Sequence, residues 1–188
     1  MKIILLILLL ISTLTADRDG GPYIGVGYGE SSYNSDGLYE QLGSDTSGSG
    51  TFYFGAYINK HLSVELGYVS FDAWHVQDGY KIDETATLGF GALSVSTLAH
   101  YAFFDDALDF YAKFGVGEMS ASGIPASGFT MLYGGGIGYR INEWLSLKVA
   151  YDIYNFNYDK TVTVGTTETI TTYEMQINYI YSAIEVQF

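Results

Sequence analysis

The chain has 188 residues, no cysteine and a net charge of −13, with 8 Lys and Arg against 21 Asp and Glu. A disulfide framework and a lipid-modified cysteine are therefore excluded, and the scarcity of cations argues against nucleic acid as a partner. Aromatic residues make up 16% of the chain, which also has 23 Gly and only 2 Pro, a composition typical of many short strands in a single domain.

The amino-terminal segment has the pattern of a secretory signal peptide. Lys2 is followed by an apolar run over residues 3–11 and then by small residues that end at Ala16. The run is too short to span a bilayer as a helix, which needs about 20 residues. We therefore predict a signal peptide over residues 1–16 and one mature domain over residues 17–188.

Polar and apolar side chains alternate in eight segments of the mature chain. Within residues 145–154, for example, Leu147 and Val149 share one face of the predicted strand, and Lys148 and Asp152 share the other. The eight predicted strands are residues 22–30, 51–59, 62–71, 85–103, 108–117, 129–141, 145–154 and 177–188.

The fourth predicted strand contains the one irregularity in this alternation. Its outward face runs from Leu93 to Phe103, whereas Leu88 and Phe90 fall on the opposite parity. We therefore predict a bulge near Gly91 that returns these two side chains to the outward face.

Long and short connections alternate between the strands. The long ones cover residues 31–50, 72–84, 118–128 and 159–168, and the short ones lie near residues 60, 105 and 142. This rhythm predicts an all-β fold, an eight-stranded antiparallel up-and-down transmembrane β-barrel with short periplasmic turns. An even number of strands closes the sheet and leaves no edge unpaired in lipid. We expect an aromatic girdle at the periplasmic interface from Phe103, Phe104, Tyr139, Trp144 and Phe188.

The last strand, INYIYSAIEVQF over residues 177–188, has one apolar face that ends on an aromatic residue. It resembles the closing strand of bacterial outer-membrane barrels. The resemblance implies that Phe188, Val186 and Ile184 form the signal read by the outer-membrane assembly machinery.

Three further stretches, YINKHLSVELGY, FFDDALDFYAKFGVG and GIGYRINEWLSLKVAYD, resemble the transmembrane domain of the OmpA family. The resemblance covers essentially the whole mature chain, and because the sequence stops at Phe188 we expect the small OmpX-like barrels to be nearer in architecture. It implies residence in the outer membrane of a Gram-negative bacterium. The implied partners are outer-membrane lipid, lipopolysaccharide and the assembly machinery, and we expect a monomer.

The inward faces of the predicted strands are rich in glycine but also carry charges. The predicted lumenal charge network comprises Glu65, Lys113, Arg140, Lys148 and Glu185. Counting from the turns places Glu65 and Lys148 at similar depth on opposite sides of the lumen, and Arg140 beside Glu185 near the periplasmic mouth. In the OmpA-family resemblance, Glu65 and Lys148 align with an interior ion pair, while a further inward acid is replaced by Gly138.

These observations leave several functions open. We expect a structural envelope role with a lumen plugged by side chains, so that the barrel offers at most a small ion pathway. A gate formed by rearranging charges is one alternative. Another is an adhesin or ligand-binding barrel that acts through its outer loops, including a protruding ribbon at residues 161–175.

Catalysis and metal binding have weak support. The chain has three histidines, His61, His75 and His100, and His100 lacks the serine two residues later that a lipid A deacylase pattern requires. Asp72, His75 and Asp78 share one loop without a spaced partner ligand, which is weak support for a metal site. We therefore expect no enzyme, no cofactor and no metal.

Overall fold

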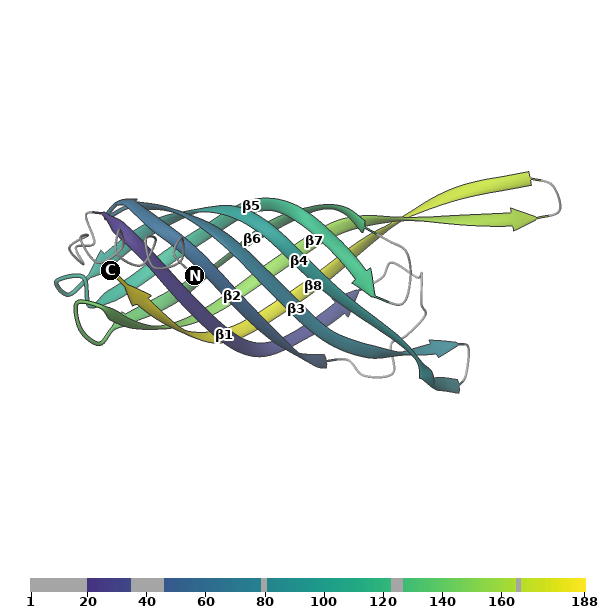
Figure 1. Cartoon of the computed structure of the whole chain (residues 1–188), viewed down its shortest axis with the longest axis horizontal. Helices are drawn as coiled ribbons and strands as arrows, with labels where there is room; N and C mark the ends of the chain where they lie inside the picture. The colour runs from purple at the N-terminus through teal and green to yellow at the C-terminus, as the bar shows by residue number, and fades with distance from the viewer. Residues whose placement is uncertain (1–19, 35–45, 79–80, 123–126, 165–166) are drawn as a thin grey trace, which may run out of the picture.

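In the computed structural model the chain forms one closed antiparallel barrel, in which each strand pairs with the next and β8 returns to β1 (Figure 1). The structure describes residues 20–34, 46–78, 81–122, 127–164 and 167–188, without the side chains of residues 74–78, 81–88, 127, 158–164, 167–171 and 173. The predicted signal peptide lies outside the described residues. The strands are β1 (Gly21–Asn34), β2 (Thr46–Asn59), β3 (Leu62–Asp78), β4 (Lys81–Phe103), β5 (Leu108–Ser122), β6 (Ser127–Arg140), β7 (Leu145–Val164) and β8 (Thr167–Gln187).

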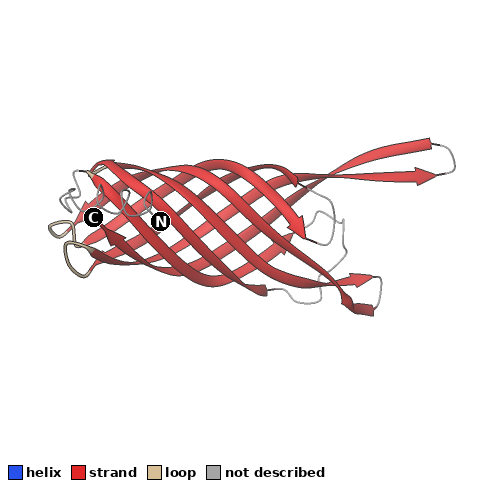
Figure 2. Ribbon diagram, in the orientation of Figure 1, coloured by secondary structure: helices blue, strands red, loops and turns tan. Residues whose placement is uncertain are grey.

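The predicted fold, an all-β eight-stranded antiparallel barrel, is confirmed. Closing the sheet satisfies the backbone N–H and C=O groups of both strands at the β1–β8 seam, where an open sheet would leave an edge. None of the described residues forms a helix long and apolar enough to cross a membrane (Figure 2).

Three short turns lie at one end of the barrel, called here the short-turn end (Figure 1). Asn59 Oδ1 accepts a hydrogen bond from the backbone N–H of His61 at 2.8 Å, and Asn142 Oδ1 accepts one from the N–H of Leu145 at 2.8 Å. Asparagine closes tight turns in this way. In the turn between β4 and β5, residues 104–106 have φ values of 54°, 54° and 64°, a left-handed conformation that aspartate tolerates better than most residues.

At the opposite end, called here the long-loop end, several strands run further than the alternation of apolar residues predicts. The pairing of β7 with β8 continues through Tyr158↔Tyr173 to Val164↔Thr167. Figure 1 shows this hairpin projecting past the other strands as a two-stranded ribbon. The backbone ladder continues because each strand supplies the other's hydrogen-bond partners, whether or not lipid surrounds it.

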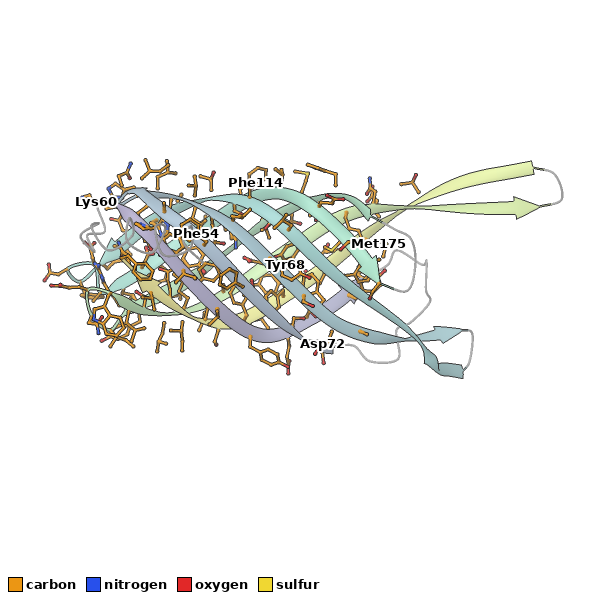
Figure 3. All side chains as sticks on the ribbon, in the orientation of Figure 1. Phe54, Lys60, Tyr68, Asp72, Phe114 and Met175 are labelled. Atoms are coloured by element: carbon orange, nitrogen blue, oxygen red, sulfur yellow. The ribbon has the colours of Figure 1, made fainter. Side chains whose placement is uncertain are left out.

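The outer wall carries an apolar band around the middle of the barrel. Side chains such as Phe54, Tyr68 and Phe114 point outward from it and are 44%, 50% and 55% exposed (Figure 3). The band lies between Lys60 at the short-turn end and Asp72 near the long-loop end, both labelled in Figure 3. A surface of this composition is stable in hydrocarbon and would be a large exposed apolar patch in water.

Aromatic residues mark both edges of the apolar band. At the short-turn edge Phe103, Phe104, Tyr139 and Trp144 are exposed and Phe188 is half-buried, and towards the long-loop edge Tyr28 and Tyr133 are exposed. Rings with one apolar body and one polar tip favour the two interfaces of a bilayer.

Phe90 corrects one detail of the sequence interpretation. It does not return to the outer face, because it is 5% exposed and packs inside the barrel against Tyr33 and Phe156, with ring centroids 5.6 Å and 5.4 Å away. The register of β4 with β5 stays regular through Gly89. The register of β3 with β4 first shifts beyond Phe90, between Phe71 and Trp74, and shifts again between His75 and Val76, so Phe90 lies before both irregularities and keeps its inward parity.

Candidate functional site

Buried ionisable side chains fill the half of the barrel next to the short turns. Their relative exposures lie between 1% and 7%, and they are Glu65, His100, Asp109, Lys113, Lys148, Asp152 and Glu185. Each falls on the inward parity of its strand, so the alternation that builds the apolar outer wall also places these groups inside. Unpaired charges would be costly in such a site, so the geometry of their pairing decides what the interior can do.

Glycines on the inward faces make room for large rings. A Cβ atom on Gly55 would overlap the ring of Tyr23, and one on Gly25 would overlap the ring of Tyr53. Both tyrosines are buried, at 0% and 2% exposure. The pairing of glycine with tyrosine across β1 and β2 fills this part of the lumen with aromatic rings.

The first charged cluster is built around Lys113. Its Nζ lies 2.6 Å from Glu65 Oε1 and 3.3 Å from Asp152 Oδ2. Gly134 of β6 lies in register between Lys113 of β5 and Asp152 of β7, and because glycine has no side chain the two groups meet across the intervening strand. Tyr181 OH donates to the same Asp152 oxygen at 3.1 Å.

The second charged cluster is built around Lys148, whose Nζ forms a buried ion pair with Glu185 Oε2. The same ammonium group lies 5.1 Å, 5.6 Å and 5.2 Å from the ring centroids of Tyr23, Tyr53 and Tyr111. Such cation–π contacts are favourable when the cation is desolvated. Three rings and one carboxylate therefore replace the water that this ammonium group has lost.

The predicted pairing of Glu65 with Lys148 is not the one that the structure shows. Glu65 pairs with Lys113, and Lys148 pairs with Glu185. Equal counts from two turns do not give equal positions around a barrel with tilted, staggered strands. Glu185 is the diagonal neighbour of Lys148 across the β7–β8 ladder, where Ser146 pairs with Glu185, so it reaches Lys148 without crossing the lumen.

Arg140 lies at the mouth of the barrel and level with Glu185, as predicted, because Ser146 pairs with both residues, but its side chain bonds to other groups. Its Nη2 donates to the backbone oxygen of Glu143 at 2.9 Å and to Gln187 Oε1 at 3.4 Å. Arg140 is the last residue of β6, level with Ser146 at the start of β7, so its long side chain reaches the adjacent turn. Of the five predicted network residues, Arg140 therefore stands apart from the two charged clusters.

A chain of hydrogen bonds that was not predicted links the short-turn end to the first cluster. His100 Nδ1 lies 2.8 Å from Asp109 Oδ2, and His100 Nε2 lies 2.8 Å from Ser63 Oγ. Ser63 Oγ is 3.2 Å from Tyr23 OH, which donates to Glu65 Oε2 at 3.5 Å. The polar chain therefore runs from Asp109 to the Lys113 cluster.

The alternation of inward and outward residues already placed the members of this hydrogen-bond chain inside the barrel. Ser63 and Asp109 are the inward residues of β3 and β5 nearest to their turns, and His100 is an inward residue of β4 that only Ala102 separates from its turn on the same face. Their distances to one another depend on the stagger of the three strands, which the sequence pattern does not give.

The other half of the lumen, towards the long-loop end, is closed by apolar side chains. Phe71 packs edge-on against Tyr154 and Tyr179, with ring centroids 5.4 Å and 5.8 Å apart. Buried around these rings are Val69, Phe90, Met119, Leu132, Phe156, Met175 and Ile177. We call this layer the aromatic plug, and it lies in series with the charged clusters along the barrel axis.

A cavity of about 20 Å³ remains at the short-turn mouth, lined by Tyr57, Asp109, Arg140 and Lys148, among others. That is room for about one water molecule. The described side chains thus leave only a small space beside the clusters at this end.

Metal ligation has no support in the residues that the structure describes, which include no group of three His, Asp or Glu side chains placed to hold an ion. In the sequence cluster of Asp72, His75 and Asp78, the side chains of His75 and Asp78 are outside the described set.

A closed barrel with an apolar outer band, aromatic edges and an interior filled by side chains defines the class of transmembrane outer-membrane β-barrels. The chain belongs to the outer membrane protein β-barrel domain family, whose model matches residues 3–182. It is therefore a protein of the Gram-negative outer membrane, and in such barrels the short turns generally lie on the periplasmic side.

Several solved structures share this fold. Neisserial surface protein A aligns with a TM-score of 0.62 at 11% identity, covering 89% of this chain and 97% of that one. Ail, the attachment invasion locus protein of Yersinia pestis, aligns with a TM-score of 0.57 at 14% identity over 90% and 99%. The amino-terminal barrel domain of Pseudomonas aeruginosa OprF aligns with a TM-score of 0.50 at 10% identity over 89% and 98%. No curated protein sequence matches the chain.

Proposed function

We propose that this protein is a structural component of the outer membrane whose lumen is closed to general solute flow. The observation that carries the proposal is the series arrangement of two fillings. The Lys113 and Lys148 clusters occupy the periplasmic half, and the aromatic plug around Phe71 occupies the half towards the long loops. An eight-stranded barrel is just wide enough for its own side chains to fill, so these two layers leave at most a narrow ion pathway.

Single-channel recording tests this proposal. The mature chain is refolded and inserted into planar bilayers, where we expect low or flickering conductance. A large, steady conductance would overturn the proposed closure.

The proposal includes no hydrolytic activity, although Ser63, His100 and Asp109 are connected as in a hydrolase triad. Ser63 is 0% exposed, and its Oγ also bonds to Tyr23 OH. An acyl substrate must reach the serine oxygen, and the small cavity at the mouth holds about one water molecule. A fluorophosphonate probe should therefore leave Ser63 unlabelled in the folded barrel, and stoichiometric labelling would contradict this part of the proposal.

The carboxy-terminal strand is proposed as the assembly signal. Phe188 donates its backbone N–H to Pro22 O at 2.9 Å, and Val186 and Ile184 pair with Ile24 and Val26 of β1. Ile184 is 51% exposed on the outer wall. The three residues thus lie on the strand that closes the barrel, with an apolar face that assembly factors can reach before closure.

A second candidate function, recognition through the projecting β7–β8 ribbon, has its own support. The ladder from Tyr158↔Tyr173 to Val164↔Thr167 stands clear of the other strands (Figure 1). Such a ribbon offers backbone groups for pairing with an incoming strand. Deleting residues 161–168 should abolish binding to intact host cells or extracellular matrix and leave the barrel folded, and unchanged binding would remove this candidate.

A further inference from the structure

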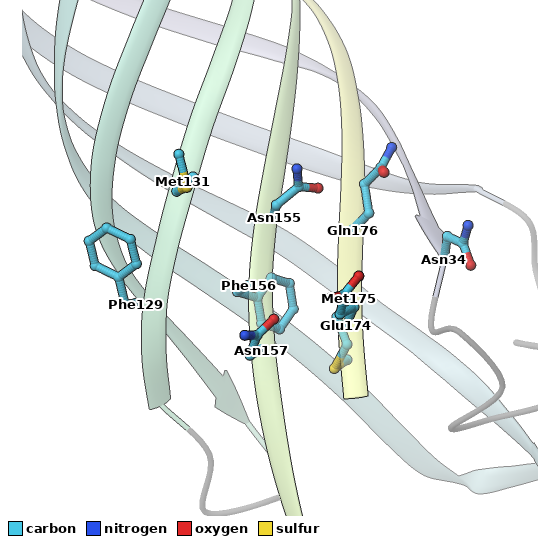
Figure 4. Close-up of a pocket in the computed structure, with 9 residues that line it drawn as sticks. All are labelled: Asn34, Phe129, Met131, Asn155, Phe156, Asn157, Glu174, Met175 and Gln176. Atoms are coloured by element: carbon cyan, nitrogen blue, oxygen red, sulfur yellow. The ribbon is translucent and has the colours of Figure 1, made fainter. Parts of the chain in front are cut away.

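A groove of about 480 Å³ lies on the wall near the long-loop end, between β6, β7, β8 and the end of β1 (Figure 4). Its polar lining includes the amides Asn34, Asn155, Asn157 and Gln176, on neighbouring strands. Asn155 pairs with Gln176 across the β7–β8 ladder, and Gln176 pairs with Asn34 across the β8–β1 ladder. Their shared outward parity forms a row of amides, here called the amide groove.

Phe129 and Met131 of β6 border the amide groove on one side (Figure 4). They are 65% and 43% exposed. Of the described residues that line the groove, Glu174 is the one charged side chain, and none is Lys or Arg. This lining disfavours a phosphate group. It suits a neutral ligand rich in hydroxyl groups, because an amide donates and accepts hydrogen bonds together while a ring packs on an apolar sugar face.

The amide groove starts where the outer apolar band stops. On β7 the outward residues change from Val149, Tyr151 and Ile153 to Asn155 and Asn157. On β8 Ile184 and Ile180 give way to Asn178 and Gln176, whose side chains bond to each other at 2.6 Å. The groove therefore lies at the headgroup level of the outer leaflet and opens sideways towards the lipids.

A second groove, of about 540 Å³, lies lower on the same wall. The small outward side chain of Ser182 lies in register with Tyr28 on one side and Val149 on the other, and Ile184 and Leu147 complete the lining. This hollow, called the acyl groove, faces the hydrocarbon region of the bilayer. Residues 176 and 182 are about 20 Å apart along β8 at about 3.3 Å per residue, and the tilt of the strand reduces this to about the depth of one leaflet.

We propose that the wall formed by β6, β7, β8 and β1 binds a glycolipid of the outer leaflet. The amide groove holds an uncharged sugar of the headgroup and the acyl groove holds one acyl chain. The succession of the two grooves along the same strands, β7, β8 and β1, favours a lipid over a free sugar. Phe156 and Met175 of the aromatic plug also line the amide groove, but lipid binding on the outer wall does not depend on whether the barrel conducts ions.

Native mass spectrometry of the refolded mature chain in detergent tests this proposal. The probe is a monoglucosyl diacylglycerol, compared with diacylglycerol, with phosphatidylglycerol of the same acyl chains and with free maltotriose. We expect the glycolipid to bind about tenfold more tightly than each of the other three, because each competitor lacks one half of the contacts or adds a charge.

Two groove variants, each with a matched control variant, test where the glycolipid binds. The double substitution Asn155→Leu with Gln176→Leu removes the hydrogen bonds of the amide groove. Ser182→Leu fills the hollow of the acyl groove and keeps the wall around it apolar. Each should weaken glycolipid binding about tenfold. Ser70→Leu with Ser120→Leu, and Thr97→Leu, make matched changes on outward positions of β3, β5 and β4 and should leave it unchanged. Equal binding of phosphatidylglycerol, equal binding of maltotriose, or equal losses in the control variants would overturn the proposal.

Discussion

Glu65 of β3 and Lys113 of β5 form a buried ion pair across an intervening strand, with 2.6 Å between Oε1 and Nζ. Ser96 of β4 lies in register between Glu65 and Gly115, and small residues at these positions let the two long side chains meet inside the lumen. Because Lys113 also lies 3.3 Å from Asp152, one ammonium group compensates two carboxylates. The first charged cluster therefore depends on a single lysine, Lys113.

The first prediction concerns that lysine. Lys113→Met keeps the volume of the side chain but leaves Glu65 and Asp152 without their cation, and losing one partner of a buried pair costs about 3–5 kcal/mol. We expect the free energy of unfolding, measured by urea titration in lipid vesicles, to fall by that amount. Lys60→Met is the control, because Lys60 is exposed in the turn between β2 and β3, and it should change stability little. Equal effects of the two substitutions would show that the cluster is not formed.

A second prediction tests whether Lys148 pairs with Glu185, as in the structure, or with Glu65, as the sequence suggested. Double-mutant cycles of Lys148→Met with Glu185→Gln should give a coupling of about 1–3 kcal/mol, as expected for groups in contact. The cycle of Lys148→Met with Glu65→Gln should give a smaller coupling, because Tyr23 lies between these groups. If the Glu65 cycle gave the larger value, the pairing across the lumen predicted from the sequence would be the correct one.

Alternation within the strands, together with the rhythm of long and short connections, was enough to predict the barrel and the face on which most residues lie. Lys148 points inward and Val149 outward as their parity requires, at 4% and 55% exposure. The period of two is a local property of the strand backbone and survives any change in the neighbouring strands. Glycine-rich inward faces and short asparagine turns are likewise local features, so they could also be predicted from the sequence.

The pairing of the charges was not predictable in the same way. Lys148 meets Glu185 because of the register of β7 with β8, and register depends on the stagger of the whole barrel. The Asp109–His100–Ser63 chain depends on the stagger of three strands. Phe90 was placed on the wrong face because an apolar side chain was taken to face outward, whereas the lumen at this level is filled by rings such as Tyr33 and Phe156.

A third prediction concerns the amino terminus. A basic residue, a short apolar run and small residues ending at Ala16 are the features that signal peptidase recognises. Mass spectrometry of the protein from outer-membrane fractions should therefore find a chain that begins at Asp17. An intact Met1 would contradict the signal peptide.

A fourth prediction separates assembly from stability. Phe188 is half-buried at the edge of the barrel, so its deletion should change the stability of refolded barrel by at most about 1–3 kcal/mol. The same deletion should remove most of the protein from the outer membrane of cells, because the assembly machinery would no longer find the terminal aromatic residue that it recognises. Phe188→Tyr, which keeps the ring, is the control and should assemble. Normal outer-membrane levels of the deleted protein would show that the signal lies elsewhere.

The last prediction tests whether the two fillings of the lumen act in series. Phe71→Ala removes a ring that packs against Tyr154 and Tyr179, and Lys113→Ala opens the charged cluster in the other half. Because ions must pass both layers, we expect each single substitution to leave the conductance low in planar bilayers. Together the two substitutions should give a steady open level. Phe54→Ala, which changes an outward-facing ring, combined with Lys113→Ala is the matched control and should stay closed. A steady open level from either single substitution would show that one layer alone closes the barrel.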